Sequence, residues 1–213
     1  MTSAVIVSTA RTPLTKSWKG AFNMTHGATL GGHVIEHAIQ RAGIDAAEVD
    51  DVIMGCGTPE GASGANIARQ AALRAGCPIT VSGMTVNRFC SSGLQAVALA
   101  ADQIRLGNAD LMLAGGTESM SMVPMMGNKV ALAPSVFDND HVAIAYGLGI
   151  TAEKVAEEWK VSRADQDAFA LASHQKAIAA IAAGEFAGEI SPYEVLSHLP
   201  DLAGNTIQLR KKL

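Results

Sequence analysis

The hydrophobic residues of the chain fall into short strand-like runs that alternate with longer runs at helical spacing. The pattern predicts strands at 4–9, 52–54, 82–86 and 109–114, and helices at 28–42, 66–75 and between Cys90 and Gly107. The run at 4–9 is short, β-branched and apolar, which is typical of a fully buried strand. Strands that alternate with helices predict an α/β fold with a mainly parallel sheet and helices on both faces.

The pattern changes after about residue 119. Residues 120–140 show no clear period and are read as an irregular excursion. Helices are predicted at 151–159 and at 162–183, because Ser162 followed by Asp165 forms a capping box at the start of the second. Residues 189–195 are compatible with a strand. The final residues carry a basic cluster without a stop signal, so we expect the sequence to end within a subdomain.

Cys90 stands between an apolar strand and the start of a helix. We expect Ser91 and Ser92 to satisfy free N–H groups of the first turn, and the helix, apolar nearly all round, to be buried. The free N–H groups and the helix dipole at such a position favour an anion, and a thiolate is easily made there. Arg88 could add positive charge. A free cysteine is usually a small buried hydrophobe, however, so position alone leaves both interpretations open.

The composition of the 213 residues is that of a globular protein, with 48% hydrophobic and 17% charged residues. The net charge is −4 and no basic block precedes the last residues, so neither nucleic acid nor an anionic membrane is an expected partner. Three cysteines, Cys56, Cys77 and Cys90, argue against a disulfide scaffold and for a reducing compartment. No signal peptide or membrane span is visible, and the cytoplasm is the expected location.

His33, Glu36 and His37 match the H-x-x-E-H pattern of some zinc hydrolases. The spacing places both histidines on one helix face, but Gln40 and Arg41 continue that face as an ordinary solvated stripe. Short motifs of this kind often arise by chance, so a zinc hydrolase is only an alternative hypothesis, and no metal is expected. The glycine-rich residues 55–61 are read as a turn and not as a phosphate site, because Pro59 interrupts them.

The letters around Cys90, V-N-R-F-C-S-S-G-L-Q-A, resemble the nucleophile motif of the thiolase family. Further segments resemble the same family in the same order, at 5–13, 66–70, 115–121, 149–153 and 162–169. The resemblance implies a thiolase-like α/β fold of two similar halves with a loop domain inserted in the first. Residues 1–118 then form most of the first α-β-α half, with its mainly parallel mixed sheet, and 119–213 begin the inserted loop domain.

The resemblance also implies an activity, the reversible cleavage or formation of 3-oxoacyl-CoA by an acyl-CoA:acetyl-CoA C-acyltransferase. Cys90 would be the nucleophile that carries the acyl group, and its backbone N–H would contribute to the oxyanion site. Gly147 and Leu148 align with a family segment beside the acyl pocket. Some biosynthetic thiolases have a histidine in place of Gly147. The glycine here argues against a strict preference for acetoacetyl-CoA and allows a longer 3-oxoacyl-CoA as the substrate. No cofactor is implied besides the coenzyme A thioester substrate.

The second half of the family fold supplies a histidine from a G-H-P segment and a cysteine from a C-x-G segment, and neither segment occurs here. We therefore expect the 213-residue chain alone to be inactive in turnover. The family implies a homodimer or tetramer, in which the strand at 82–86 pairs with its copy, and a role in fatty acid metabolism. A non-catalytic thiolase-like binding or assembly module is the alternative.

Overall fold

A computed structural model describes residues 3–138, 147–201 and 203–212, and it divides the chain into two compact units. The first unit joins Met1–Asn128 with Glu189–Leu213, and the second unit is Lys129–Gly188. The predicted boundary at residue 118 refers to the family architecture and stays a prediction. Within the described residues, no helix is long and apolar enough to cross a membrane.

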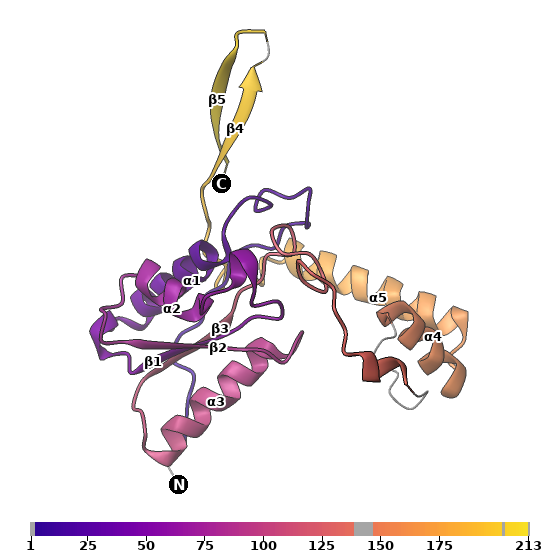
Figure 1. Ribbon diagram of the computed structural model, residues 1–213, viewed down its shortest axis with the longest axis horizontal. Coiled ribbons are helices and arrows are strands. Elements are labelled where there is room, and N and C mark those ends of the chain that lie inside the picture. The colour runs from indigo at the N-terminus through magenta and orange to yellow at the C-terminus, as the bar shows by residue number, and fades with distance from the viewer. Residues whose placement is uncertain (1–2, 139–146, 202, 213) are drawn as a thin grey trace. The chain divides into compact units, whose positions relative to one another are not determined.

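The first unit contains a three-stranded parallel sheet, formed by β1 (Asp51–Gly55), β2 (Ser82–Val86) and β3 (Met112–Gly116). The strand order is β2-β1-β3, and both pairings are parallel. Gly55 at the end of β1 lies opposite Val86 on one side and Gly116 on the other, so the three strands end level with one another. The predicted parallel α/β organisation is confirmed (Figure 1).

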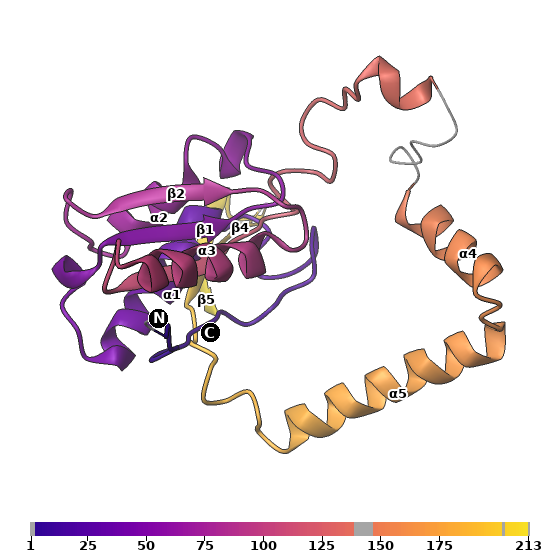
Figure 2. The same cartoon turned by 90° about the horizontal axis from the view of Figure 1, so that it is seen from below.

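Helices cover both faces of this sheet, as the alternation of strands and helices predicted. Val52 and Met54 pack in one core cluster with residues of α1 (Gly27–Ala42) and α2 (Ile67–Arg74). Ile53 points to the opposite face and packs against α3 (Ser92–Leu106). Successive side chains of a strand face opposite sides, so β1 contributes to both cores. Figures 1 and 2 show α3 on the side of the sheet away from α1 and α2.

The predicted strand at 4–9 is wrong in this structure. Residues 4–9 form no strand, and Val5, Ile6 and Val7 are between 69% and 76% exposed. The nearest β-type contact is a single bridge between Arg11 and Ile190. A strand needs a neighbouring strand to take up its backbone hydrogen bonds, and none of the described strands pairs with this segment. An apolar run indicates the tendency to pair but does not supply the partner.

The expectation that the Cys90 helix is buried all round is also wrong. The inner face of α3 is buried through Ala96 and Ala100, which pack against Ile53. On the other face Leu94 and Leu106 are more than 70% exposed. Only one face lies against the sheet, because the described residues place no further layer over the helix. The helix itself ends at Gly107 in the left-handed conformation, as predicted.

Residues after 188 return to the first unit, and their strands differ from the prediction. Only Ile190 and Val195 of the predicted segment 189–195 take part in β-type pairing. An antiparallel hairpin follows, with β4 at Val195–Asp201 and β5 at Thr206–Lys212. Three short 3-10 helices complete the described elements, at Ala46–Glu48, Gly61–Ser63 and Pro134–Phe137.

The second unit consists of α4 (Leu148–Glu158) and α5 (Arg163–Ala182) after an irregular stretch. The predicted start of α5 is confirmed, because the Ser162 hydroxyl accepts a hydrogen bond from the Asp165 backbone N–H at 3.2 Å. Neither helix has a buried residue. A side-chain cap therefore supports the start of α5 but not of α4, whose N-cap residue Gly147 makes no such bond, and the unit by itself buries neither helix.

Candidate active site

Three loops meet at the carboxyl end of the parallel sheet. Residues 56–58 follow β1, residues 87–90 follow β2, and residues 117–118 follow β3. The strands end level with one another, so their carboxyl ends bring the three loops to one edge. This edge is where open parallel sheets place their ligands. Cys90 and the acidic side chain of Glu118 both belong to these loops.

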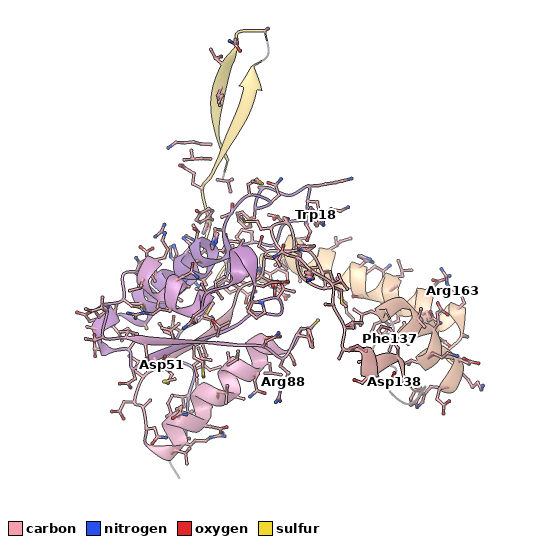
Figure 3. The ribbon with its side chains drawn as sticks, viewed as in Figure 1. Trp18, Asp51, Arg88, Phe137, Asp138 and Arg163 are labelled. Carbon is pink, nitrogen blue, oxygen red and sulfur yellow. The ribbon has the colours of Figure 1, made fainter. Side chains whose placement is uncertain are left out.

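The corner before α3 is held by its two serines in a way that the sequence did not indicate. The Ser92 hydroxyl accepts a hydrogen bond from the Arg88 N–H at 2.9 Å and donates one to the Phe89 carbonyl. The Ser91 hydroxyl donates to the Arg88 carbonyl at 2.9 Å and does not cap the helix. The expectation that both serines satisfy first-turn N–H groups is therefore wrong. They tie the corner together instead, and Figure 3 labels Arg88 there.

Phe89, the residue before Cys90, has a left-handed backbone with φ 48°. This conformation is uncommon for a bulky residue and persists where the surroundings hold it. The Asn87 side chain accepts a hydrogen bond from the Phe89 N–H at 2.8 Å, and the Ser92 N–H binds the Phe89 carbonyl at 3.0 Å. The chain therefore reverses tightly at Phe89 and presents Cys90 next to the first turn of α3.

Glycine allows the start of α3 to approach the end of β1. A Cβ atom on Gly55 would lie 2.3 Å from the Ser92 carbonyl carbon and 2.5 Å from the Gly93 nitrogen. Gly116 at the end of β3 is also close, since its Cβ would lie 3.5 Å from the Gly93 Cα. A side chain at Gly55 would push the helix away from the sheet. These glycines fix the distance between the sheet edge and the Cys90 corner.

Accessibility separates the three thiols, all of which are free. Cys56 and Cys77 are buried, whereas Cys90 is exposed. Burial raises the pKa of Cys56 to about 11, with a further contribution from the negative charge of Glu118. Burial likewise raises the pKa of Cys77. Because the thiolate is the reactive form, both buried thiols are suppressed at neutral pH, and Cys90 is the accessible one.

Glu118 was not assigned a role from the sequence, yet its carboxylate accepts hydrogen bonds from three residues at this edge. Its carboxylate accepts bonds from the Gly57 N–H at 2.6 Å and the Thr58 hydroxyl at 2.7 Å. The Cys56 thiol donates to it at 3.5 Å. An acidic residue directly after a strand that ends in Gly115 and Gly116 was the available signal. The Glu118 carboxylate occupies the Gly57 N–H and would repel a phosphate. This agrees with the interpretation of residues 55–61 as a turn and not as a phosphate site.

Gly147 and Leu148 lie at the beginning of α4, in the second unit. Gly147 is the residue before the helix, with an extended backbone, and Leu148 is 75% exposed. Tyr146, the residue before Gly147, lies outside the described residues. Cys90 belongs to the first unit, so a pocket that includes all three residues stays a prediction.

The histidine motif on α1 contacts the returning chain. The His33 ring packs edge-on against Tyr193, with 5.0 Å between ring centroids, and its Nε2 lies 3.4 Å from the Ser191 carbonyl oxygen. The rings of His37 and His33 pack with 4.4 Å between their centroids. Burial lowers the pKa of His33, and the charge of His37 lowers it further. Among the described residues, no group of three His, Cys, Asp or Glu side chains is arranged to hold a metal. The contacts of His33 support a packing role.

The strand predicted to pair between subunits is β2, which stands at an edge of the described sheet. Its inner side pairs with β1, and Met84 is 41% exposed. An edge strand has backbone groups available for a second partner. The pairing of β2 with a copy of itself stays a prediction.

Comparison with known proteins places residues 4–206 in the family described as thiolase, N-terminal domain. The chain is 48% identical over 196 residues to the 3-ketoacyl-CoA thiolase of Bacillus subtilis (strain 168), covering 92% of this chain and 50% of the relative. It is 44% identical over 210 residues to the acetyl-CoA acetyltransferase of Rhizobium meliloti (strain 1021), covering 94% and 53%. The acetyl-CoA acetyltransferase of Escherichia coli (strain K12) is 43% identical over 209 residues, covering 92% and 52%. The chain spans about half the length of these curated relatives.

Proposed function

The chain belongs to the thiolase family, and we propose that it forms the nucleophile-bearing half of an acyl-CoA:acetyl-CoA C-acyltransferase. The observation that carries the proposal is the position of Cys90. It is the exposed thiol of the three, and it lies at the carboxyl end of a parallel sheet beside the start of α3. Cysteine suits acyl transfer because it is both a strong nucleophile and a good leaving group.

In the proposed reaction the Cys90 thiolate attacks the 3-keto carbon of a 3-oxoacyl-CoA. The bond between carbons 2 and 3 breaks, the electron pair passes to carbon 2, and protonation there releases acetyl-CoA. The acyl group stays on Cys90 as a thioester. The thiol of a second coenzyme A, after losing its proton, attacks this thioester, releases the shortened acyl-CoA and restores the thiolate. The backbone N–H of Cys90 stabilises the oxyanion that forms when the thioester carried by Cys90 is attacked or, in the reverse direction, formed from an acyl-CoA.

The proton transfers in this scheme need groups that residues 1–213 do not contain. The family's G-H-P histidine and C-x-G cysteine are absent from the sequence. A helix terminus stabilises an anion by only about 0.3–1 kcal/mol, whereas a positioned general base contributes roughly 10²–10⁴-fold in rate. We therefore expect acylation of Cys90 by the 213-residue chain to be slow, with no measurable turnover until a second-half chain is added.

The remaining assignments rest on the family and on position. Gly147 and Leu148 are proposed to border the acyl group. Because Gly147 has no side chain where some biosynthetic thiolases have a histidine, the pocket would have room for an acyl chain longer than acetoacetyl. A homodimer or tetramer is proposed through β2, an edge strand of the described sheet. Coenzyme A thioesters are the proposed partners, without another cofactor, and the cytoplasm is the proposed location.

Mass mapping of the folded chain tests the nucleophile. After limiting iodoacetamide at neutral pH, we expect label on Cys90 well before Cys56 or Cys77. Incubation with acetyl-CoA should add one acetyl group to the same residue, and Cys90→Ser should lose it while the far-UV circular dichroism stays unchanged. Cys77→Ala is the matched control and should keep acetylation. Acetylation at another residue, or equal acetylation of Cys90→Ser, would overturn the proposal.

The alternative is a non-catalytic binding or assembly module. It predicts that the chain binds a coenzyme A thioester without an acyl-cysteine, even when a second-half chain is present. Cleavage of a 3-oxoacyl-CoA, measured with and without a second-half chain from a relative, separates the two functions. Activity that depends on the second half and is lost in Cys90→Ser supports the thiolase.

A further inference from the structure

We propose that Glu118 is a positioning residue for the nucleophile, because its carboxylate holds the loop at 56–58 against the peptide that joins Phe89 to Cys90. The proposal rests on the proposed function, in which the N–H of that peptide stabilises the thioester oxyanion. Glu118 is not placed in contact with the reacting atoms. It acts through the loop at 56–58.

The backbone that leads into Glu118 is fixed first. Thr117 is buried, its N–H donates to the Gly55 carbonyl at 3.0 Å, and its hydroxyl donates to the Gly27 carbonyl at 2.8 Å. These two bonds anchor the end of β3 to the end of β1 and to the start of α1. The Glu118 side chain therefore extends from a rigid point towards the loop after β1.

The carboxylate then engages every residue of that loop. Its oxygens accept the Gly57 N–H at 2.6 Å, the Thr58 hydroxyl at 2.7 Å and the Cys56 thiol at 3.5 Å. The first two distances are in the range of charge-assisted hydrogen bonds, which are stronger than neutral ones. On the opposite side the Cys56 N–H donates to the Val86 carbonyl at 3.0 Å, at the end of the strand that leads to Cys90. The loop is thus held from both sides.

The loop in turn lies beside the nucleophile's own peptide. A Cβ atom on Gly57 would lie 3.6 Å from both the carbonyl carbon and the carbonyl oxygen of Phe89. That carbonyl belongs to the same planar peptide as the Cys90 N–H. Phe89 is in the left-handed conformation, so the orientation of this peptide depends on its surroundings. If Glu118 releases Gly57, the Cys90 N–H loses a support on the Gly57 side.

The test compares two reactions of the same thiol in Glu118→Gln. A glutamine has no negative charge. Its one acceptor oxygen can keep the Gly57 N–H, but its N–H₂ group then faces the Thr58 hydroxyl, which must accept instead of donate, so both short bonds lose their charge-assisted strength. Acetylation by acetyl-CoA needs the oriented N–H, and a misplacement of such a group costs up to about 10²-fold. We expect acetylation of Cys90 to slow by roughly 10- to 100-fold. Alkylation by iodoacetamide needs only the thiolate and should stay within about threefold of the wild-type rate.

Two sets of variants complete the experiment. Glu48→Gln makes the same change at an exposed carboxylate that accepts the Asp45 N–H at 2.9 Å, and it should leave both rates unchanged. Thr58→Val removes one donor to Glu118 and should reduce acetylation selectively, whereas Thr58→Ser keeps the hydroxyl and should restore it. This pair decides the matter if Glu118→Gln does not fold.

The outcomes are distinct. Selective loss of acetylation in Glu118→Gln and Thr58→Val, with Thr58→Ser like the wild type, supports the positioning role. Unchanged acetylation, or an equal fall in acetylation and alkylation, overturns it while leaving Cys90 as the nucleophile. A wild-type chain that is alkylated at Cys90 but is never acetylated would overturn the proposed function itself, and the role of Glu118 with it.

Discussion

Both units of the chain contain helices with apolar residues at helical spacing, but these helices differ greatly in burial. In the sheet unit, the strand β1 is buried from Val52 to Gly55, and helices pack on both of its faces. In the helical unit, neither α4 nor α5 has a buried residue, although Phe169, Ile178 and Ile181 are large and apolar. Both helices nevertheless form, α5 with a side-chain cap and α4 without one, so a helix can be specified locally without burial. Burial requires a second surface, which the sheet provides and the helical unit by itself does not.

The largest difference between the units should appear when a large side chain is truncated. Ile53 is fully buried against Ala96 and Ala100, so Ile53→Ala should lower the free energy of unfolding by about 2–5 kcal/mol. Phe169 is 79% exposed, and Phe169→Ala should change it by no more than about 0.5 kcal/mol. Urea unfolding followed by circular dichroism measures both. Equal costs would mean that the helical unit buries Phe169 against a further surface in solution.

High pH should act on the sheet unit through Cys56. Its pKa is raised to about 11 from an ordinary 9.0, first by burial and then by Glu118, so the folded chain keeps this proton longer than the unfolded chain does. The associated stability is fully present below pH 9 and is lost as the pH rises towards 11, with a total of about 3 kcal/mol. Urea unfolding of wild type and Cys56→Ala across this range isolates the contribution. A wild-type slope that persists in Cys56→Ala would assign it to other groups.

A glycine-to-alanine substitution, which adds one methyl group, should destabilise the sheet unit more than the helical unit. Gly55→Ala places a Cβ within 2.5 Å of the backbone of Ser92 and Gly93, neither of which is a flexible side-chain end. Overpacking of this kind costs about 1–3 kcal/mol and displaces the Cys90 corner, so acetylation should fall as well. Gly147→Ala meets nothing within 4 Å and has a φ of −63°, so its cost should stay within about 0.5 kcal/mol. Thermal unfolding of the two variants gives the comparison, and a mild Gly55→Ala would show that α3 can shift freely.

The smallest effect concerns the cap of α5. Ser162→Ala removes the hydroxyl that accepts the Asp165 N–H, which should cost about 1 kcal/mol of helix stability. The loss should appear as faster amide hydrogen exchange in the first turn of α5, without a change in α1–α3. Ser162→Asn preserves a capping oxygen and should restore slow exchange. If exchange in α5 is unaffected by Ser162→Ala, contacts other than the cap hold this helix in solution.

Most element boundaries could be predicted because their signals are local. The ends of α1 and α3 follow from Gly43 and Gly107, which adopt the left-handed conformation at low cost, and the start of α5 follows from Ser162. The strand β2 and its position before Cys90 were predicted from a short apolar run. The motif around Cys90 indicated the family, which the comparison with known proteins bears out.

The errors share a different cause. Residues 4–9 carry a strand pattern and α3 carries an apolar surface, yet neither pattern names the segment that would pair with it or cover it. Ser91 and Ser92 were expected to cap a helix, but their hydroxyls have several backbone partners within reach. The three-dimensional path of the corner selects Arg88 and Phe89. Hydrogen-bond partners that are equally possible from the sequence are distinguished only by the three-dimensional path of the backbone.

The sequence by itself therefore determined the helix ends, because each depends on neighbours within a few residues. The alternation of strands and helices along the chain determined the parallel α/β class, and the motif around Cys90 indicated the candidate nucleophile through the family resemblance. Only the tertiary structure decided that Cys56 and Cys77 are buried while Cys90 is exposed. It also decided that Glu118 reaches the loop at 56–58, although about sixty residues separate them. The physical reason is that parallel strands gather distant loops at one edge of a sheet, and the strand order that selects those loops is a property of the packed core.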